Sequence, residues 1–96
     1  MNISNKRIKN IHFIGIGGSG MSGIAEVLIN LGYEVTGSDI QDSKVIQRLK
    51  SIGADIQLKH NRKNLKVTEL VVISSAIDSS NEEIIEAREK GIPILS

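Results

Sequence analysis

Three segments with apolar residues at helical spacing alternate with short strand-like runs along this 96-residue chain. The first helical segment has five apolar residues on one face: Met21, Ile24, Ala25, Leu28 and Leu31. The second has a stripe of three: Val45, Leu49 and Ile52. Each of the three segments is followed by a glycine placed to end a helix in the left-handed conformation: Gly32, Gly53 and Gly91. This alternation predicts an α/β domain built on a parallel sheet.

Five strands are expected, over residues 11–16, 34–38, 54–58, 70–74 and 92–95. The first and fourth are almost continuously apolar, as in central strands that are covered on both faces. Right-handed crossovers then favour a Rossmann-like, doubly wound parallel sheet in the order 3-2-1-4-5, with helices on both faces. Pro93 puts the last strand at a sheet edge or marks its beginning. No long linker or repeat interrupts the chain, so residues 1–96 are expected to form one domain.

Three smaller features carry further expectations. Ser80 and Glu83 have the spacing of a capping box at the start of the third helix. Residues 60–68 are polar and are expected to connect strands three and four through a loop or a short helix. His12 lies inside an apolar strand, where a structural histidine is expected rather than a catalytic one.

The composition argues against several functional classes. Lysine and arginine total 12 against 11 acidic residues, and Phe13 and Tyr33 are the only aromatic residues, so neither a basic surface nor a stacking platform for nucleic acid is expected. There is no cysteine, and no apolar run reaches the roughly 20 residues that span a membrane. The start resembles no signal peptide, and Lys6, Arg7 and Lys9 are expected to form a solvated leader. A cytoplasmic location is therefore expected.

A glycine-rich turn follows the first predicted strand and leads directly into the first helix. The six residues from Gly15 to Gly20 satisfy G-x-G-x-x-G. In such turns the first glycine permits a tight turn, the second lets the backbone approach a pyrophosphate, and the third lets the helix lie close to the strand. Free N–H groups at the helix start can then bind phosphate oxygens. Met21 stands where a Walker A loop would need lysine, so the turn predicts diphosphate binding without ATP hydrolysis.

Other candidate ligand contacts lie at the carboxyl ends of the predicted strands. Asp39 ends the second strand, where related folds place an acid that binds ribose hydroxyls, and Ser38 precedes it. Both are also compatible with a surface turn. The fourth strand ends in a segment of four candidate residues that lies across the crevice from the glycine turn: Ser74, Ser75, Ala76 and Ile77. His60 follows the third strand and is placed to reach a base or ribose. No catalytic triad or metal cluster is evident, so neither catalytic residues nor metal ligands are assigned.

The stretch IHFIGIGGSGMSGIAEVLINLGYEVTGSD, followed by SSAI and later GIPIL, closely resembles the amino-terminal domain of UDP-N-acetylmuramate:L-alanine ligases. The resemblance covers nearly the whole chain, and GIGGSGMSGIAE is much more specific than a general dinucleotide fingerprint. A related murein-tripeptide ligase family fits less well, because its glycine loop and strand-four motif differ.

By this resemblance, the full-length enzyme uses ATP and magnesium to join L-alanine to the lactyl carboxyl of UDP-N-acetylmuramate through an acyl phosphate, in peptidoglycan precursor synthesis. Its first domain holds the UDP-sugar. The resemblance assigns diphosphate contacts to five residues: Gly17, Gly18, Ser19, Gly20 and Met21. It places Asp39 near uridine and residues 74–77 near phosphate or sugar. His60 matches a histidine near the nucleoside, although Lys59 replaces the glycine that usually precedes it.

The family's ATP-binding loop and amino-acid-binding domain come after the last residue of this chain, Ser96. The resemblance therefore implies a substrate-binding fragment, without a cofactor of its own, that works with the remaining ligase domains of a full-length chain. The main alternative is an NAD(P)-binding module of an oxidoreductase or a redox-sensing regulator, whose glycine turn and ribose acid would look alike. A third hypothesis, a purely structural interaction domain, leaves the four-glycine turn unexplained.

Overall fold

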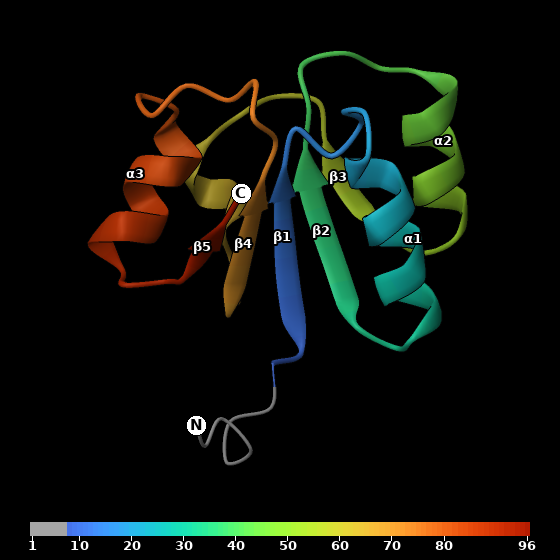
Figure 1. The fold of residues 1–96 in the computed structure, drawn as a ribbon, viewed down its shortest axis with the longest axis horizontal. Coiled ribbons are helices and arrows are strands. Elements are labelled where there is room, and N and C mark those ends of the chain that lie inside the picture. Colours follow the sequence, from blue (N-terminus) through green and yellow to red (C-terminus); the bar gives the residue numbers. More distant parts are fainter. Residues whose placement is uncertain (1–7) are drawn as a thin grey trace.

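The strands and helices follow one another in the order that the sequence predicts (Figure 1). The computed structural model describes residues 8–96; Lys6 and Arg7 of the expected leader lie outside them. The first half of the chain contains β1 (Asn10–Ile14), α1 (Met21–Asn30), β2 (Glu34–Ser38) and α2 (Lys44–Ser51). The second half contains β3 (Asp55–Gln57), the short 3₁₀ helix η1 (Arg62–Asn64), β4 (Leu70–Ile73), α3 (Glu82–Glu89) and β5 (Ile94–Leu95).

The strands form one five-stranded sheet in the order β3-β2-β1-β4-β5, and every pairing is parallel. The doubly wound order predicted from the sequence is therefore confirmed. β1 lies at the centre, with Ile14 opposite Ser38 of β2 on one side and Ile73 of β4 on the other. β2 and β3 lie on one side of β1, and β4 and β5 lie on the other. The direction in which successive strands are added to the sheet therefore reverses, and the reversal point is the boundary between β1 and β4.

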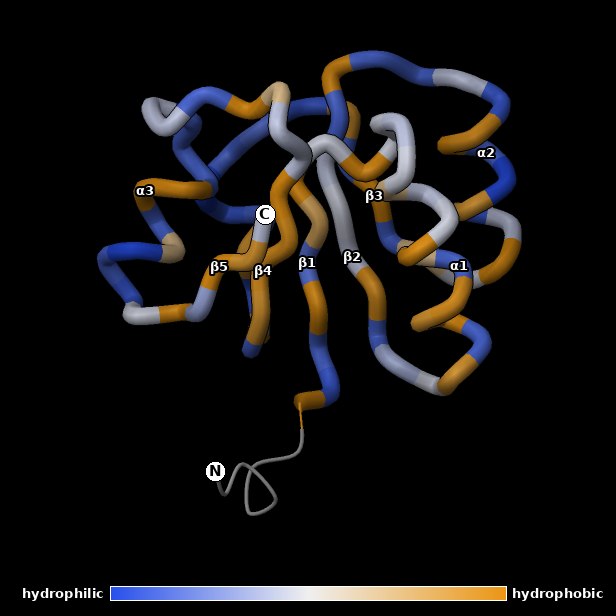
Figure 2. Tube along the Cα trace, in the orientation of Figure 1, coloured by the Kyte–Doolittle hydropathy of each residue, from blue (hydrophilic) through white to orange (hydrophobic). Residues whose placement is uncertain are grey.

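Helices cover both faces of the sheet, as predicted, and each face has its own hydrophobic core. The core under α1 and α2 includes Phe13, Ala25 and Ile46, and the core under α3 and η1 includes Ile14 and Ile84. Hydrophobic residues accordingly concentrate along β1 and β4 at the middle of the molecule (Figure 2). Because side chains alternate along a strand, β1 sends Phe13 to one core and its neighbour Ile14 to the other.

Some boundaries and faces differ from the prediction. β1 ends at Ile14 rather than at residue 16, because the N–H groups of Gly15 and Ile16 both donate to the Ser38 carbonyl in a turn. β5 begins only at Ile94, since the N–H of Ile92 donates to Ala87 and closes α3. β3 and β4 are also shorter than expected, at three and four residues.

The apolar faces of the first two helices were only partly predicted. In α1, Met21 and Ala25 are buried, whereas Ile24 and Leu31, expected on the same face, are 51% and 68% exposed. In α2, Ile46 and Leu49 supply the buried stripe, while Val45 is 40% exposed and Ile52 is only partly buried. The glycines expected to end the helices do have positive φ angles: Gly32, Gly53 and Gly91.

The carboxyl ends of the strands meet at one edge of the sheet, at the top of Figure 1. The turn after β1, the loop after β2 and the loop after β4 all lie at this edge. In open α/β sheets, ligands bind at this edge, where the winding reverses.

Candidate functional site

The glycine turn after β1 is held by backbone hydrogen bonds on both of its sides. Gly15 has a φ of 81° and its N–H donates to the Ser38 carbonyl at 2.8 Å. The N–H of Gly18 returns to the Gly15 carbonyl at 2.9 Å, and the N–H of Met21 donates to the Gly18 carbonyl at 3.0 Å. A Cβ at Gly15 would also lie 3.1 Å from Ile77. The first glycine therefore serves the tight turn, as predicted.

The second glycine has a contact within the domain that was not predicted, its approach to a pyrophosphate stays a prediction, and the third glycine does not have the predicted packing role. A Cβ on Gly17 would lie 3.0 Å from a carboxylate oxygen of Asp39 and 3.1 Å from Ile46, so this position is restricted by contact within the domain. Gly20 has nothing within 4 Å of such a Cβ but has a φ of 81°, so backbone conformation selects glycine there. The closest strand contact is at Gly37 of β2, where a Cβ would meet Ile16 at 2.7 Å.

The start of α1 leaves backbone donors free for a ligand. Gly20 is its N-cap, so no side chain caps the helix, and its first turn has no acidic residue. The N–H groups of Ser19 and Gly20 have no hydrogen-bond acceptor within residues 8–96. Free N–H groups and the positive end of the helix dipole favour an anion at this position.

Asp39 braces the glycine turn from the end of β2. One oxygen of its carboxylate accepts the N–H of Gly17 at 2.9 Å, and the other accepts the N–H of Gln41 at 3.1 Å. Asp39 is also one of the residues that line the cleft described next. Asp39 therefore has a structural role that was not predicted, while its ligand contact stays a prediction.

A cleft of about 330 Å³ opens between the glycine turn and the loops after β2 and β4. Eight of the candidate residues line it: Gly15, Gly17, Gly18, Asp39, His60, Ser74, Ala76 and Ile77. Three further lining residues were not singled out from the sequence: Ile40, Gln41 and Ser43. These three residues follow Asp39 closely in the sequence. Their closeness to a predicted site residue is the sequence feature that could have indicated them.

Five candidates do not line the cleft: Ser19, Gly20, Met21, Ser38 and Ser75. Ser19 and Gly20 lie at the open helix start beside it, whereas Met21 is buried in the core under α1. Ser38 is fully buried and contacts the cleft residue His60. Ser75 is exposed in the turn after β4, in which Ser74 accepts the Ala76 N–H through its hydroxyl.

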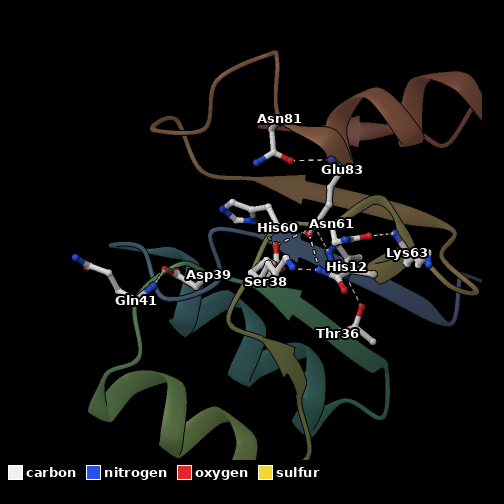
Figure 3. Close-up of polar contacts among 12 residues, drawn as sticks. His12, Thr36, Ser38, Asp39, Gln41, His60, Asn61, Lys63, Asn81 and Glu83 are labelled. Atoms are coloured by element: carbon white, nitrogen blue, oxygen red, sulfur yellow. Dashed lines mark hydrogen bonds and ion pairs between the residues drawn. The ribbon is translucent and has the colours of Figure 1, made fainter.

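A buried polar network on the α3 face of the sheet reaches the cleft through His60. Figure 3 shows its polar contacts. Its centre is the carboxylate of Glu83, which has no exposed surface. One carboxylate oxygen of Glu83 accepts hydrogen bonds from His12 Nε2 at 2.6 Å and from the Ser38 hydroxyl at 2.8 Å. The other ring nitrogen of His12 lies 2.6 Å from the Thr36 hydroxyl. His12 is thus a structural histidine with both nitrogens paired, as expected.

The same carboxylate holds the loop that carries His60. The second oxygen of Glu83 accepts the backbone N–H of Asn61 at 2.9 Å and the side-chain amide of Asn64 at 2.8 Å. Burial by itself would raise the pKa of Glu83, but the hydrogen bond and charge of His12, together with these two amides, hold that pKa below its ordinary value. Glu83 is therefore ionised at neutral pH, and it connects α3, β1, β2 and the loop after β3.

The capping-box prediction for Ser80 and Glu83 is wrong. Asn81 is the N-cap of α3, and its side chain accepts the N–H of Glu83 at 2.8 Å. Glu83 turns inward, because the donors gathered beneath the sheet compensate the burial of its charge. Local spacing gave no sign of this role, since the partners of Glu83 lie elsewhere in the sequence.

The family model described as Mur ligase family, catalytic domain, matches residues 10–96. The chain belongs to the Mur ligase family. A curated Mur ligase relative, the UDP-N-acetylmuramate–L-alanine ligase of Solidesulfovibrio magneticus, is 56% identical over 89 residues, which are 93% of this chain and 20% of that protein. The chain therefore spans about a fifth of the length of the curated relatives that it matches.

Solved Mur ligase structures agree with this assignment. A UDP-N-acetylmuramate-alanine ligase from Thermotoga maritima matches with a TM-score of 0.87 and 36% identity over 93% of this chain and 20% of that one. A murein peptide ligase from Psychrobacter arcticus matches with a TM-score of 0.85 and 28% identity, over 92% of this chain and 19% of that one. The order of identities follows the sequence resemblance, which favoured the L-alanine ligases.

Residues 8–96 of this Mur ligase domain contain neither a metal-binding cluster nor a membrane-spanning helix. In that range, no three histidine or acidic side chains are grouped so that they could hold a metal ion. No helix within it combines the length and the apolar character needed to cross a bilayer.

Proposed function

We propose that this chain is the part of a UDP-N-acetylmuramate–L-alanine ligase that binds the UDP portion of UDP-N-acetylmuramate. The observation that carries the proposal is the cleft. There the glycine turn, Asp39, His60 and the turn after β4 come together at the point where the strand order reverses. The identity of 56% to a ligase of that name supports the choice of ligand.

Each side of the cleft suits a different part of the nucleotide. The free N–H groups of Ser19 and Gly20, at the start of α1 rather than in the cleft lining, suit the diphosphate, and Ser74 offers a hydroxyl in the cleft itself. Asp39 and His60 offer polar groups for the ribose and the base. The small residues Gly18 and Ala76 leave room for the ligand to approach the backbone between them.

The volume of the cleft supports a divided binding site. At about 330 Å³ it is near the lower limit of ligand pockets, roughly 300 to 1,000 Å³, and it suits part of a UDP-sugar better than the whole. We infer that later domains of a full-length ligase complete the site around the sugar, and that they supply ATP and magnesium binding, L-alanine binding and the ligation chemistry. By the same inference the enzyme acts in the cytoplasm, in peptidoglycan precursor synthesis.

The proposal is tested by calorimetric titration of this chain with UDP-N-acetylmuramate, UDP and NADH. Saturable binding of the two uridine compounds without binding of NADH is expected. NADH binding without binding of either uridine compound would instead favour the oxidoreductase hypothesis.

A matched pair of variants connects the binding to the glycine turn. Gly18→Asp puts a negative charge beside the expected diphosphate, and Gly18→Asn has nearly the same size without the charge. Both must fit a Cβ that lies 3.1 Å from the Gly15 carbonyl, so any loss from crowding is shared. The aspartate variant should therefore bind UDP much more weakly than the asparagine variant, and equal affinities would refute an anion site at this turn.

A further inference from the structure

The buried network ends at His60, whose side chain is 19% exposed and lines the cleft. The Nδ1 atom of His60 lies 2.8 Å from the hydroxyl oxygen of Ser38. The Nε2 atom of the same ring has no hydrogen-bond partner among residues 8–96. Since no unpaired side-chain nitrogen or oxygen is buried in this part of the chain, Nε2 is open to solvent.

The single proton of the Ser38 hydroxyl decides which group donates in this chain of contacts. Ser38 Oγ lies 2.8 Å from Glu83 Oε1 and 2.8 Å from His60 Nδ1, and it can donate to only one of them. If the Ser38 hydroxyl donated to His60, Ser38 Oγ and Glu83 Oε1 would lie 2.8 Å apart with no proton between them. Donation to the Glu83 carboxylate avoids this repulsion and leaves the lone pairs of Ser38 facing His60.

The carboxylate of Glu83 is suited to be the final acceptor. It receives hydrogen bonds from His12 Nε2, from the Asn61 backbone N–H and from the Asn64 side-chain amide, as well as from Ser38. A backbone N–H can only donate, and four donors around one carboxyl group favour the ionised form, which only accepts. The depressed pKa of Glu83 agrees with this.

We propose that Glu83, acting through Ser38, is a positioning residue that keeps the proton of neutral His60 on Nδ1, so that Nε2 meets the cleft as a hydrogen-bond acceptor. Figure 3 shows the His60 ring between Asp39 and the group formed by Ser38 and Glu83. An acceptor at this position recognises a ligand donor, either a ribose hydroxyl or the imide N–H of a uracil ring. This assignment of ligand chemistry rests on the proposed function, whereas the proton position does not.

The proton position is measured directly by ¹⁵N NMR of the histidine rings, in the free protein, about two pH units above the ordinary histidine pKa of about 6.5. His60 should give the signature of the Nδ1–H tautomer. The Nε2–H tautomer, or a ring protonated on both nitrogens, would overturn the proposal. This measurement requires no substitution and no ligand.

Two variants of β2 distinguish the effect of Glu83 on His60 through Ser38 from a general disturbance of the hydrogen-bond network. Ser38→Ala removes the hydroxyl between Glu83 and His60, and His60 should lose its single-tautomer signature. Thr36→Val removes a hydroxyl two residues away that contacts only His12 in this network, and His60 should keep the wild-type signature. The proposal is overturned if Ser38→Ala leaves the tautomer unchanged, or if Thr36→Val alters it equally.

The ligand part of the proposal is tested by following His60 Nε2 in the full chain as UDP is added. UDP should shift this resonance. The comparison ligands are 2′,3′-dideoxy-UDP, which lacks the ribose hydroxyls, and N3-methyl-UDP, which lacks the imide N–H. At least one of them should fail to shift it, and equal shifts with all three would overturn the assignment of Nε2 as the acceptor for a ligand donor. If UDP does not bind at all, the proposed function fails, while the tautomer measurement still decides the role of Glu83.

Discussion

The Asp39 carboxylate accepts the backbone N–H of Gly17 at 2.9 Å, and this bond joins the end of β2 to the turn after β1. The other oxygen of the same carboxylate accepts the Gln41 N–H. Asp39 thus holds together two of the four segments that line the cleft. The negatively charged Asp39 carboxylate thus orders the backbone beside an expected anion site. Its charge is compensated there because both of its oxygens accept hydrogen bonds from backbone amides.

Asp39→Ala should lower the free energy of unfolding by about 1–3 kcal/mol, because it leaves the half-buried Gly17 N–H without its acceptor. Asp39→Asn retains one carbonyl oxygen and should lose clearly less. Urea denaturation of the two variants measures the difference. Equal losses would contradict the assignment of the loss to a missing acceptor for the Gly17 N–H.

Gly37→Ala should destabilise the fold by about 1–3 kcal/mol, because the added Cβ would lie 2.7 Å and 2.9 Å from atoms of the buried Ile16 side chain. Gly23→Ala is the matched control, since an added Cβ in the exposed interior of α1 meets nothing within 4 Å. That change should stabilise the protein by about 0.4–1 kcal/mol. Thermal and urea unfolding should therefore give opposite signs, and destabilisation by both changes would contradict the packing argument.

The depressed pKa of Glu83 predicts a loss of stability in acid. Because its pKa in the folded state lies below the ordinary value of 4.5, the unfolded chain binds the proton more readily. The stabilising contribution of Glu83 is thus fully present above pH 4.5 and is lost as the pH falls through the folded-state pKa. Unfolding free energies measured from neutral pH downward should fall in this range.

Glu83→Gln tests whether Glu83 is the cause of this acid sensitivity. The variant should be less stable at neutral pH, because an amide replaces a carboxylate that accepts four hydrogen bonds. Its stability should also fall less steeply below pH 4.5 than that of the wild type. If the unfolding free energy of the variant fell with pH as steeply as that of the wild type, the acid sensitivity would come from other carboxylates.

A protein consisting of these 96 residues should not catalyse ligation by itself. The chain spans about a fifth of its curated relatives, and its glycine turn lacks the lysine of a Walker A loop. Addition of ATP, magnesium, L-alanine and UDP-N-acetylmuramate should release no phosphate above background. Phosphate release that depends on L-alanine would refute the division of labour proposed for the domains.

Much of the architecture was predictable from the sequence. The alternation of apolar runs with amphipathic helices, combined with the right-handed crossover rule, led to the observed strand order, and Gly15 marked the turn where the cleft forms. These features depend on hydrophobic period and on backbone conformation, which are local properties of the chain. Strand ends were less well predicted, because at Ile16 and Ile92 hydrogen bonds to the Ser38 and Ala87 carbonyls replaced sheet pairing.

The tertiary structure alone decided how the polar residues are used. Glu83 follows Ser80 at the spacing of a capping box, yet its partner His12 lies 71 residues away in the sequence. Asp39 was recognisable as a strand-end acid, but its bond to Gly17 was not, since that bond depends on β1 and β2 lying side by side. The sequence by itself determined where strands, helices and the glycine turn form, because those preferences act between near neighbours. Only folding determined which donors surround a buried carboxylate, because the cost of burying its charge is compensated by groups that the sheet topology brings together.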